Sequence, residues 1–176
     1  DWSDVEPAIF GTLLERALAS DERSGDPGIK ATLANLGMVC MKLGDLAAAK
    51  RYQTRAVQLE ERAMGAEHPE VAGQLSVLGA ILRQAGELKD AKQVQLRALA
   101  ITEKHFPPAH PRVALAHNNV AMIAERLNEY AEALRYFEKA HQLLSAIGHP
   151  MASTVAEKCN QLRPLAKVHL WILLAL

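Results

Sequence analysis

The sequence repeats itself at a fixed interval, and this repetition constrains its fold more than any other feature. Pro27, Pro69 and Pro111 follow one another at intervals of 42 residues, and Pro150 comes 39 residues after the third. Between them a similar stretch returns, as in "LANLGMVCMKLGDLAAAKRYQTRAV" and "LSVLGAILRQAGELKDAKQVQLRAL". A period of about 20–50 residues is typical of an array of similar structural units, each packed against its neighbours.

Each repeat divides into two segments at a residue that tolerates the left-handed conformation with which helices end. These residues are Gly44, Gly86 and Asn128. An acidic residue follows each of them and suits the positive end of the next helix dipole. The proline after each inter-repeat His can begin a helix, because its missing N–H would have no partner there. Every repeat therefore predicts two helices joined by a tight turn.

Small residues stand where the two helices of a repeat would cross. The first helix carries Gly37, Gly79 and Ala121 at equivalent positions. The second helix carries two rows of alanine: Ala49, Ala91 and Ala133, and Ala56, Ala98 and Ala140. Side chains no larger than a methyl group let two helix axes approach closely, and large apolar neighbours fill the space around them. One helix pair cannot bury its apolar faces alone, so the pattern predicts a stack with a continuous core.

The spacing predicts five segments along the chain. Residues 27–68, 69–110 and 111–149 are complete units, and residues 1–26 match the second helix of a truncated first unit. Residues 150–176 begin a partial unit or capping helix and end in an apolar tail. The predicted architecture is an all-α array of about three and a half helical hairpins.

These repeats resemble tetratricopeptide repeats in the 42-residue form found in kinesin light chains. The likeness lies in "AEHPEVAGQLSVLG", "HPRVALAHNNVA", "LNEYAEAL" and "RALAITEKHF", and it covers the three complete units. The resemblance implies a right-handed α-solenoid whose first helices line a concave surface. In that family this surface binds extended peptides, so the resemblance implies a protein–protein interaction module, with a protein or peptide partner and no cofactor.

Helical periodicity selects the residues that would face such a groove. They point away from the packing positions of the first helices: Met38, Lys42, Ser76, Arg83, Asn118, Met122 and Arg126. Asn side chains can pair with a peptide backbone, and Arg can bind a carboxylate through two hydrogen bonds. The set therefore predicts a partly apolar, acidic peptide as ligand. The alternative is that these side chains are ordinary solvated groups on exposed helices.

Two further hypotheses for the function stay open. In the first, the chain is a structural stretch of solenoid that contacts only neighbouring repeats or another copy. In the second, it is a regulatory domain attached to an enzyme outside this sequence. Because the chain does not begin with Met, we expect a piece of a longer protein.

Composition and motifs argue against several classes of function. Lys plus Arg and Asp plus Glu both number 20, so no net charge favours a nucleic acid or an anionic membrane as partner. His68, His110 and His149 recur once per unit, too far apart to share a metal ion, and we expect each to cap or pack a loop. Cys40 and Cys159 fall on packing faces, which predicts buried thiols and a reducing, cytoplasmic location. We find no phosphate loop or nucleophile–base pair and expect no enzyme activity.

The C-terminal segment departs from the repeat. Pro164 is expected to end or kink its helix, and the apolar run "VHLWILLAL", residues 168–176, is about half as long as a membrane span. An apolar run of this kind needs to be covered. Three outcomes are open: the tail caps the last unit, it docks on another copy and causes self-association, or it is a non-native end.

Overall fold

The structure, a computed structural model, describes residues 12, 16 and 28–174, with residues 169–174 described by their backbone alone. This part of the chain consists of helices and short turns without a strand. It divides into two compact units, Asp1–Ala85 and Gly86–Leu176. The segment 1–26, apart from Thr12 and Arg16, lies outside the described residues, and the limits of the repeat units stay a prediction.

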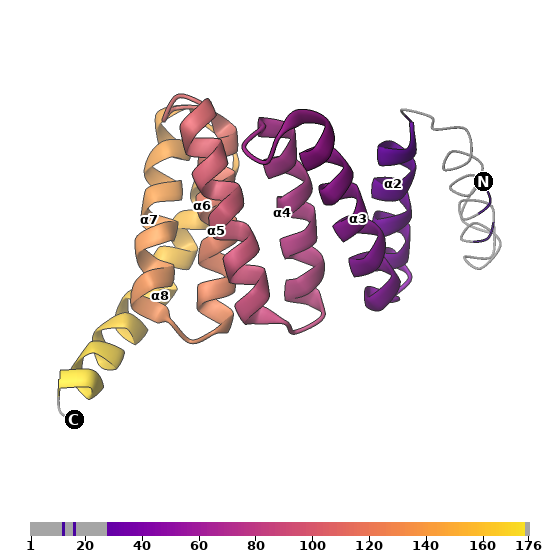
Figure 1. Cartoon of the computed structure of the whole chain (residues 1–176). Coiled ribbons are helices and arrows are strands. Elements are labelled where there is room, and N and C mark those ends of the chain that lie inside the picture. Colours follow the sequence, from indigo (N-terminus) through magenta and orange to yellow (C-terminus); the bar gives the residue numbers. More distant parts are fainter. Residues whose placement is uncertain (1–11, 13–15, 17–27, 175–176) are drawn as a thin grey trace, which may run out of the picture. The chain divides into compact units, whose positions relative to one another are not determined.

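The first unit holds three described helices: α2 (Ile29–Lys42), α3 (Leu46–Met64) and α4 (Pro69–Gln84). Helix α2 packs against α3, and α3 packs against α4 (Figure 1). Consecutive helices are therefore also neighbours in space, as expected for helices joined by short turns.

The turns form where the sequence predicts them. Gly44, Gly86 and Asn128 have φ angles of +81°, +81° and +62°, so all three adopt the left-handed conformation that ends a helix. After Gly44, the Asp45 carboxylate accepts a 2.9 Å hydrogen bond from the N–H of Ala48. This contact caps α3 by giving a partner to one of the N–H groups that a helix leaves unpaired at its start.

The core of the first unit forms where α2 crosses α3. Leu33 and Leu36 are completely buried, as is Ala49 on the α3 side. Gly37 lies so close to α3 that a Cβ atom in its place would meet Gln53 Oε1 at 3.2 Å and the Ala49 carbonyl oxygen at 3.5 Å. The predicted small residues at the helix crossing are confirmed in this unit.

Two polar contacts connect the helices of the first unit. Gln53 is completely buried, and its Nε2 donates to the main-chain oxygen and to Oε1 of Gln74 at 3.0 and 2.8 Å, which joins α3 to α4. Lys30 Nζ lies 3.0 Å from Glu60 Oε2, which joins α2 to α3. The Gln53 amide nitrogen and the Glu60 carboxylate thus have partners away from water, whereas Gln53 Oε1 is buried without a hydrogen bond among the described residues.

The second unit holds α5 (Leu88–His105), α6 (Pro111–Arg126), α7 (Tyr130–Ala146) and α8 (Met151–Leu174). Each of these helices packs against the next along the chain (Figure 1).

The core of the second unit surrounds Phe137 on α7, which is 1% exposed. Ala121, Ala133 and Ala140 are completely buried in the same cluster, which confirms the predicted small residues in this unit as well. Cys159 of α8 belongs to this cluster too. Helix α8 therefore completes the apolar core of the second unit.

Pro164 does not end its helix, because α8 runs through it to Leu174. The helix end predicted at Pro164 is therefore wrong, whereas the kink given as its alternative stays a prediction. A proline inside a helix removes one hydrogen bond and displaces a carbonyl group, at a cost of about 3 kcal/mol. Here Leu162 and Ala166, on either side of Pro164, are both buried, and their packing offsets part of this cost. Pro164 and Asn160 are exposed, so water can reach the carbonyl group that loses its partner.

The last turns of α8 extend beyond α7 (Figure 1). Leu165 and Val168 are 46% and 59% exposed, while the side chains of residues 169–176 lie outside the described part. The three outcomes for the tail therefore stay predictions. No helix in the described part is long and apolar enough to cross a membrane.

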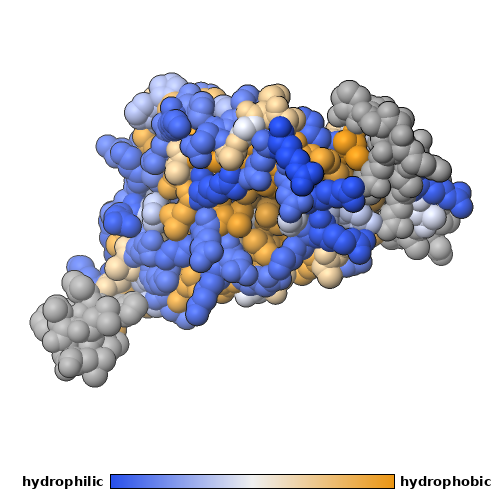
Figure 2. All heavy atoms as spheres, in the orientation of Figure 1, coloured by the Kyte–Doolittle hydropathy of each residue, from blue (hydrophilic) through white to orange (hydrophobic). Residues whose placement is uncertain are grey.

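Hydrophilic side chains cover most of the visible surface, with apolar groups between them (Figure 2). Among the described residues, the large apolar side chains with the most exposure are Met38, Leu43, Met64, Leu165 and Val168. Scattered apolar side chains are normal on a protein surface, so each needs a local reason before it counts as a binding site.

Candidate peptide-binding site

On α2 the predicted groove residues lie on the exposed side of the helix. Met38 has 42% of its surface exposed, and Lys42, one turn later, is exposed as well. Leu33, Leu36 and Cys40 are buried on the other side. A polarisable thioether, which adapts to differently shaped partners, therefore stands beside an ammonium group in water.

On α4 the corresponding side is built from small side chains. Gly73 is exposed, and a Cβ atom there would meet no atom within 4 Å. Ser76 is half-buried, and its Oγ donates a 2.9 Å hydrogen bond to the main-chain oxygen of Ala72. Arg83 is half-buried in the last turn of the helix, where the helix dipole favours a cation. This side of α4 thus offers a shallow, weakly polar surface that ends in a positive charge.

On α6 the predicted residues are less accessible than the helical wheel indicates. Asn118 is 7% exposed, and its Nδ2 lies 3.5 Å from the sulfur of Met122. We predicted that Asn118 pairs with the backbone of a peptide in the groove, but its side chain is buried in the second unit and has little surface to offer. Met122 is half-buried, and Arg126 is exposed in the last turn.

The basic residues have one feature in common. Lys42, Arg83 and Arg126 each occupy the last turn of α2, α4 and α6, respectively. A cation there stabilises its own helix by about 0.3–1 kcal/mol, so its recurrence also has a structural cause. Within the first unit, the exposed sides of α2 and α4 carry Met38, Lys42, Ser76 and Arg83, and within the second unit Met122 and Arg126 remain accessible.

The described residues contain no group of three or more His, Cys, Asp or Glu side chains that could hold a metal ion. The arrangement that they do show is one of exposed helix faces, suited to binding through surface contacts.

A family model for the tetratricopeptide repeat matches residues 29–104 and, in an overlapping second match, residues 75–146. Together the two matches cover well over half of the chain. The chain belongs to the tetratricopeptide repeat (TPR) family. A comparison with curated proteins finds no match.

Solved structures with the same fold include kinesin-light-chain-like TPR proteins. BtubC (BKLC) from P. vanneervenii is 19% identical, with a TM-score of 0.74, and the match covers 94% of this chain and 71% of that one. A kinesin-light-chain-like protein from Podosopora anserina with nearly identical TPR-like repeats is 19% identical, with a TM-score of 0.75 and coverage of 94% and 84%. The apo form of RapI is 16% identical, with a TM-score of 0.77 and coverage of 97% and 61%. The fold is thus an all-α solenoid of TPR hairpins.

The histidines before the inter-repeat prolines cap helices, as predicted. In each case the ring Nδ1 accepts a hydrogen bond of 3.1–3.2 Å from the backbone N–H two residues later: His68 from Glu70, His110 from Arg112 and His149 from Met151. Each His thus pairs an N–H group that the following TPR helix would otherwise leave unpaired, and the proline between them has no N–H to pair.

His117 is a buried polar residue that sequence reasoning misses. It stands where the other TPR units carry the buried Leu33 and Leu75, and it is 6% exposed. Its Nε2 lies 3.2 Å from Glu103 Oε1, and its ring lies 5.9 Å from that of Tyr136. Burial lowers the pKa of His117, although the nearby Glu103 carboxylate opposes this change. One sequence signal could have predicted this buried histidine: it stands where the other units carry a leucine.

Both cysteines are free and buried, as predicted. Cys40 and Cys159 are 9% and 2% exposed. Burial raises the pKa of the Cys159 thiol, and a protonated, inaccessible thiol is a poor nucleophile or metal ligand. Both residues therefore act as small apolar side chains in the TPR core.

Proposed function

We propose that this TPR chain is a protein-interaction module that binds a peptide segment of a partner through the exposed sides of the first helices within its units, α2 and α4 in the first unit and α6 in the second. The observation that supports it most is on α2. Met38 is a large apolar side chain left 42% exposed, and it stands one turn from the exposed Lys42 on a helix whose other side is buried. An exposed methionine beside a cation suits a partner segment that is both apolar and acidic.

The remaining members of the set support a ligand of the same chemistry. Ser76 and the bare Gly73 leave room for a peptide to approach α4 closely, and Arg83 stands at the end of that helix. On α6, Met122 and Arg126 repeat the pairing of a thioether and a cation. Because Asn118 is buried, we leave it out of the proposed contact surface.

Fluorescence anisotropy with labelled peptides taken from a peptide array tests this proposal. The array compares apolar peptides that contain Asp and Glu with the same peptides carrying Asn and Gln. We expect Met38→Ser and Lys42→Glu each to weaken binding of the acidic peptides several-fold. We expect Arg83→Glu to weaken acidic peptides more than neutral ones, and added salt to do the same, because exposed charges are screened within about 8 Å at physiological ionic strength.

Met64→Ser is the matched control, because Met64 is 50% exposed at the end of α3 and lies on no first helix. Binding that is unchanged by Met38→Ser, or weakened equally by Met64→Ser, would contradict the proposed site. If the array yields no ligand and the chain forms larger species as its concentration rises, the alternative of a self-assembling structural segment replaces the proposal. The exposed Leu165 and Val168 on α8 favour this alternative.

A further inference from the structure

A pocket of about 370 Å³ lies in the second unit, on α7 and beside the buried His117 of α6. We call it the α7 pocket. Its described lining residues are His117, Arg135, Tyr136, Glu138, Lys139 and Gln142. Arg135, Lys139 and Gln142 are exposed, so the pocket opens to solvent, whereas His117 at its inner end is only 6% exposed.

The packing of α6 does not explain His117. Its Nε2 lies 3.2 Å from Glu103 Oε1 of α5, but neither ring nitrogen has a hydrogen bond of good geometry within the described part of the chain. Burying a polar group without a hydrogen bond destabilises a fold, and the other units avoid this loss with Leu33 and Leu75. A histidine that is kept in place of leucine therefore points to a role in the pocket that it lines.

Lys139 is the cation of the pocket that has no partner. It is exposed and makes neither a hydrogen bond nor an ion pair among the residues that the structure describes. The other charged groups of the lining do have partners. Glu138 Oε1 lies 3.3 Å from Arg163 Nη2 of α8, and Arg135 Nη2 lies 4.0 Å from Glu132 Oε1. The pocket thus presents one positive charge that no carboxylate balances.

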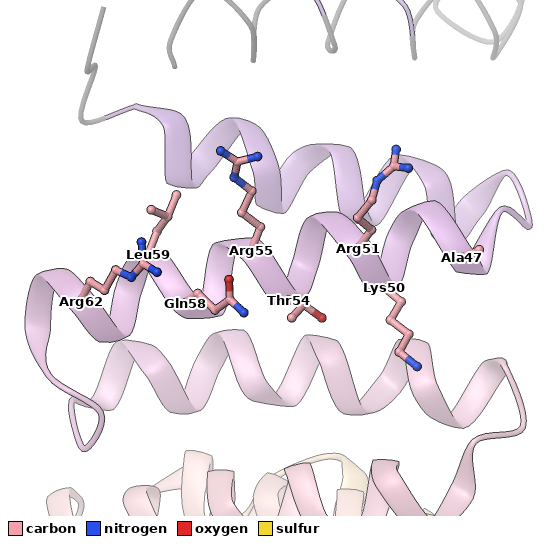
Figure 3. A pocket seen from close by; sticks show the side chains of 8 residues that line it. All are labelled: Ala47, Lys50, Arg51, Thr54, Arg55, Gln58, Leu59 and Arg62. Atoms are coloured by element: carbon pink, nitrogen blue, oxygen red, sulfur yellow. The ribbon is translucent and has the colours of Figure 1, made fainter. Parts of the chain in front are cut away.

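The equivalent surface two repeats earlier lacks this combination. There a hollow of about 620 Å³ lies on α3, with Arg55 at the position of Lys139 (Figure 3). Arg55 already interacts with other groups of the chain, and Leu33 stands at the position of His117. Of these two surfaces, the α7 pocket alone combines an unpaired cation with a buried imidazole among its described residues.

His117 and Lys139 influence each other through their charges. Burial lowers the pKa of His117 most, the Glu103 carboxylate of α5 opposes this change, and the Lys139 ammonium lowers the pKa further. Arg135 and Glu138, also on α7, line the same pocket. A carboxylate that pairs with Lys139 would offset the ammonium charge, so the pKa of His117 would rise. The imidazole therefore reports on what binds at Lys139.

We propose that the α7 pocket binds an acidic side chain of a partner protein. Lys139 supplies the charge, and the Gln142 amide supplies further N–H donors. The half-buried Tyr136 ring, with Arg135 stacked on it at 5.2 Å, offers an apolar wall for a neighbouring side chain of the partner. A phosphate group carries about two negative charges and fits less well, because Glu138 stands in the same lining. A free small anion would be covered little in an open pocket, whereas an acidic side chain is held there by the rest of its protein.

The experiment uses the full chain and three short peptides with blocked ends, in which Glu, Gln or phosphoserine stands beside a phenylalanine. Nuclear magnetic resonance of the histidine rings follows binding, and the His117 signal is the one that His117→Leu removes. We expect the Glu peptide to raise the pKa of His117. By linkage it should then bind about threefold more tightly at about pH 5 than at about pH 7.5, and the Gln peptide should not. In His117→Leu this difference should shrink to the effect of the other histidines.

Lys139→Gln should weaken binding of the Glu peptide several-fold, whereas Lys139→Arg keeps the charge and should stay within about twofold of wild type. The matched control is Lys89→Gln, because Lys89 of α5 is exposed and lies outside the lining, and its loss changes the net charge equally. We expect this control within about twofold of wild type as well. Equal losses in Lys139→Gln and Lys89→Gln, equal binding of the Glu and Gln peptides, or no binding of the Glu peptide would overturn the proposal. An unchanged pH dependence in His117→Leu would overturn the part assigned to His117, and tighter binding of the phosphoserine peptide through Lys139 would overturn the choice of a carboxylate.

The result is independent of the peptide site on the first helices, because the two sites share no residue. The His117 signal locates binding at the α7 pocket. Lys42→Glu and Arg83→Glu should leave the response of this signal to the Glu peptide unchanged, and Lys139→Gln should leave binding of the peptides selected for the first helices unaffected. Failure of one proposal would therefore not count against the other.

Discussion

Exchanging two glycines for alanine, one at a time, measures how closely α2 and α3 approach. Alanine is favoured over glycine inside a helix by about 0.8–1 kcal/mol. At Gly73 on α4 a new Cβ would meet nothing within 4 Å, so Gly73→Ala should stabilise the fold by about this amount. At Gly37 on α2 the same methyl group would lie 3.2 Å from Gln53 Oε1, which is tighter than ordinary contact.

The cost at Gly37 depends on whether Gln53 can move. Gln53 is buried and donates two hydrogen bonds to Gln74 on α4, at 2.8 and 3.0 Å. A shift that weakens one of them costs about 0.5–1.5 kcal/mol, and overpacking a helix crossing costs about 1–3 kcal/mol. These costs cancel or exceed the helix-propensity gain. We therefore expect Gly37→Ala to be neutral or to destabilise by up to about 2 kcal/mol.

Urea denaturation followed by circular dichroism measures both variants, with the midpoint compared at equal slope. A double-mutant cycle adds the decisive control, because Gln53→Ala removes the side chain that the new methyl group would touch. In that background Gly37→Ala should stabilise the fold as much as Gly73→Ala does in the wild type. If Gly37→Ala alone raises the midpoint as far as Gly73→Ala, the close approach of α2 and α3 at Gly37 is refuted.

Two further predictions concern the histidines. His110→Ala removes the acceptor for the N–H of Arg112 and should cost about 1 kcal/mol of stability. His110→Asn can still cap the helix and should cost less. Equal losses of stability in the two variants would contradict a capping role for His110. His117 has a lowered pKa in the fold, so the unfolded chain takes up a proton more readily, and stability should fall as the pH drops through about 6.5. His117→Leu places a leucine where the other units carry Leu33 and Leu75, so this variant should be more stable than wild type and should lose less stability between about pH 7 and pH 5. Urea titrations at several pH values measure this difference. If the stabilities of the two proteins fall in parallel with pH, burial of the imidazole does not cause the loss of stability at low pH.

Sequence patterns predict the helix ends and the helix crossings well, because both depend on local chemistry. A left-handed turn needs Gly or Asn whatever lies around it, so Gly44 and Asn128 mark turns without knowledge of the fold. A close helix crossing needs small residues, so Gly37 and the rows of alanine mark it equally. The side chain of the acidic residue after each turn is less predictable: Asp45 reaches back to cap α3, whereas Glu129 makes no such contact with its longer side chain.

Burial of polar residues is harder to predict, because it depends on neighbours from other helices. On the helical wheel Asn118 belongs to the exposed side of α6, yet it is 7% exposed in the second unit. Pro164 has a strong local preference against the helix interior, and the packing of Leu162 and Ala166 overrides it. In both cases packing against other helices overrides what the local sequence predicts.

Departures from the repeat indicate where this chain differs from a plain scaffold. Positions that serve the stack carry similar residues in every unit, as Gly37, Gly79 and Ala121 do, since each unit faces the same packing problem. A residue that breaks the repeat needs a separate cause, as the buried His117 does in place of leucine. The same reasoning applies to the outer side of the second helices, where Thr54 and Glu138 stand at equivalent positions beside equivalent Arg–Tyr stacks. A change from a neutral residue to a carboxylate outside the core alters the local charge without disturbing the packing, so the units of such an array can differ in charge at the positions that packing leaves unconstrained.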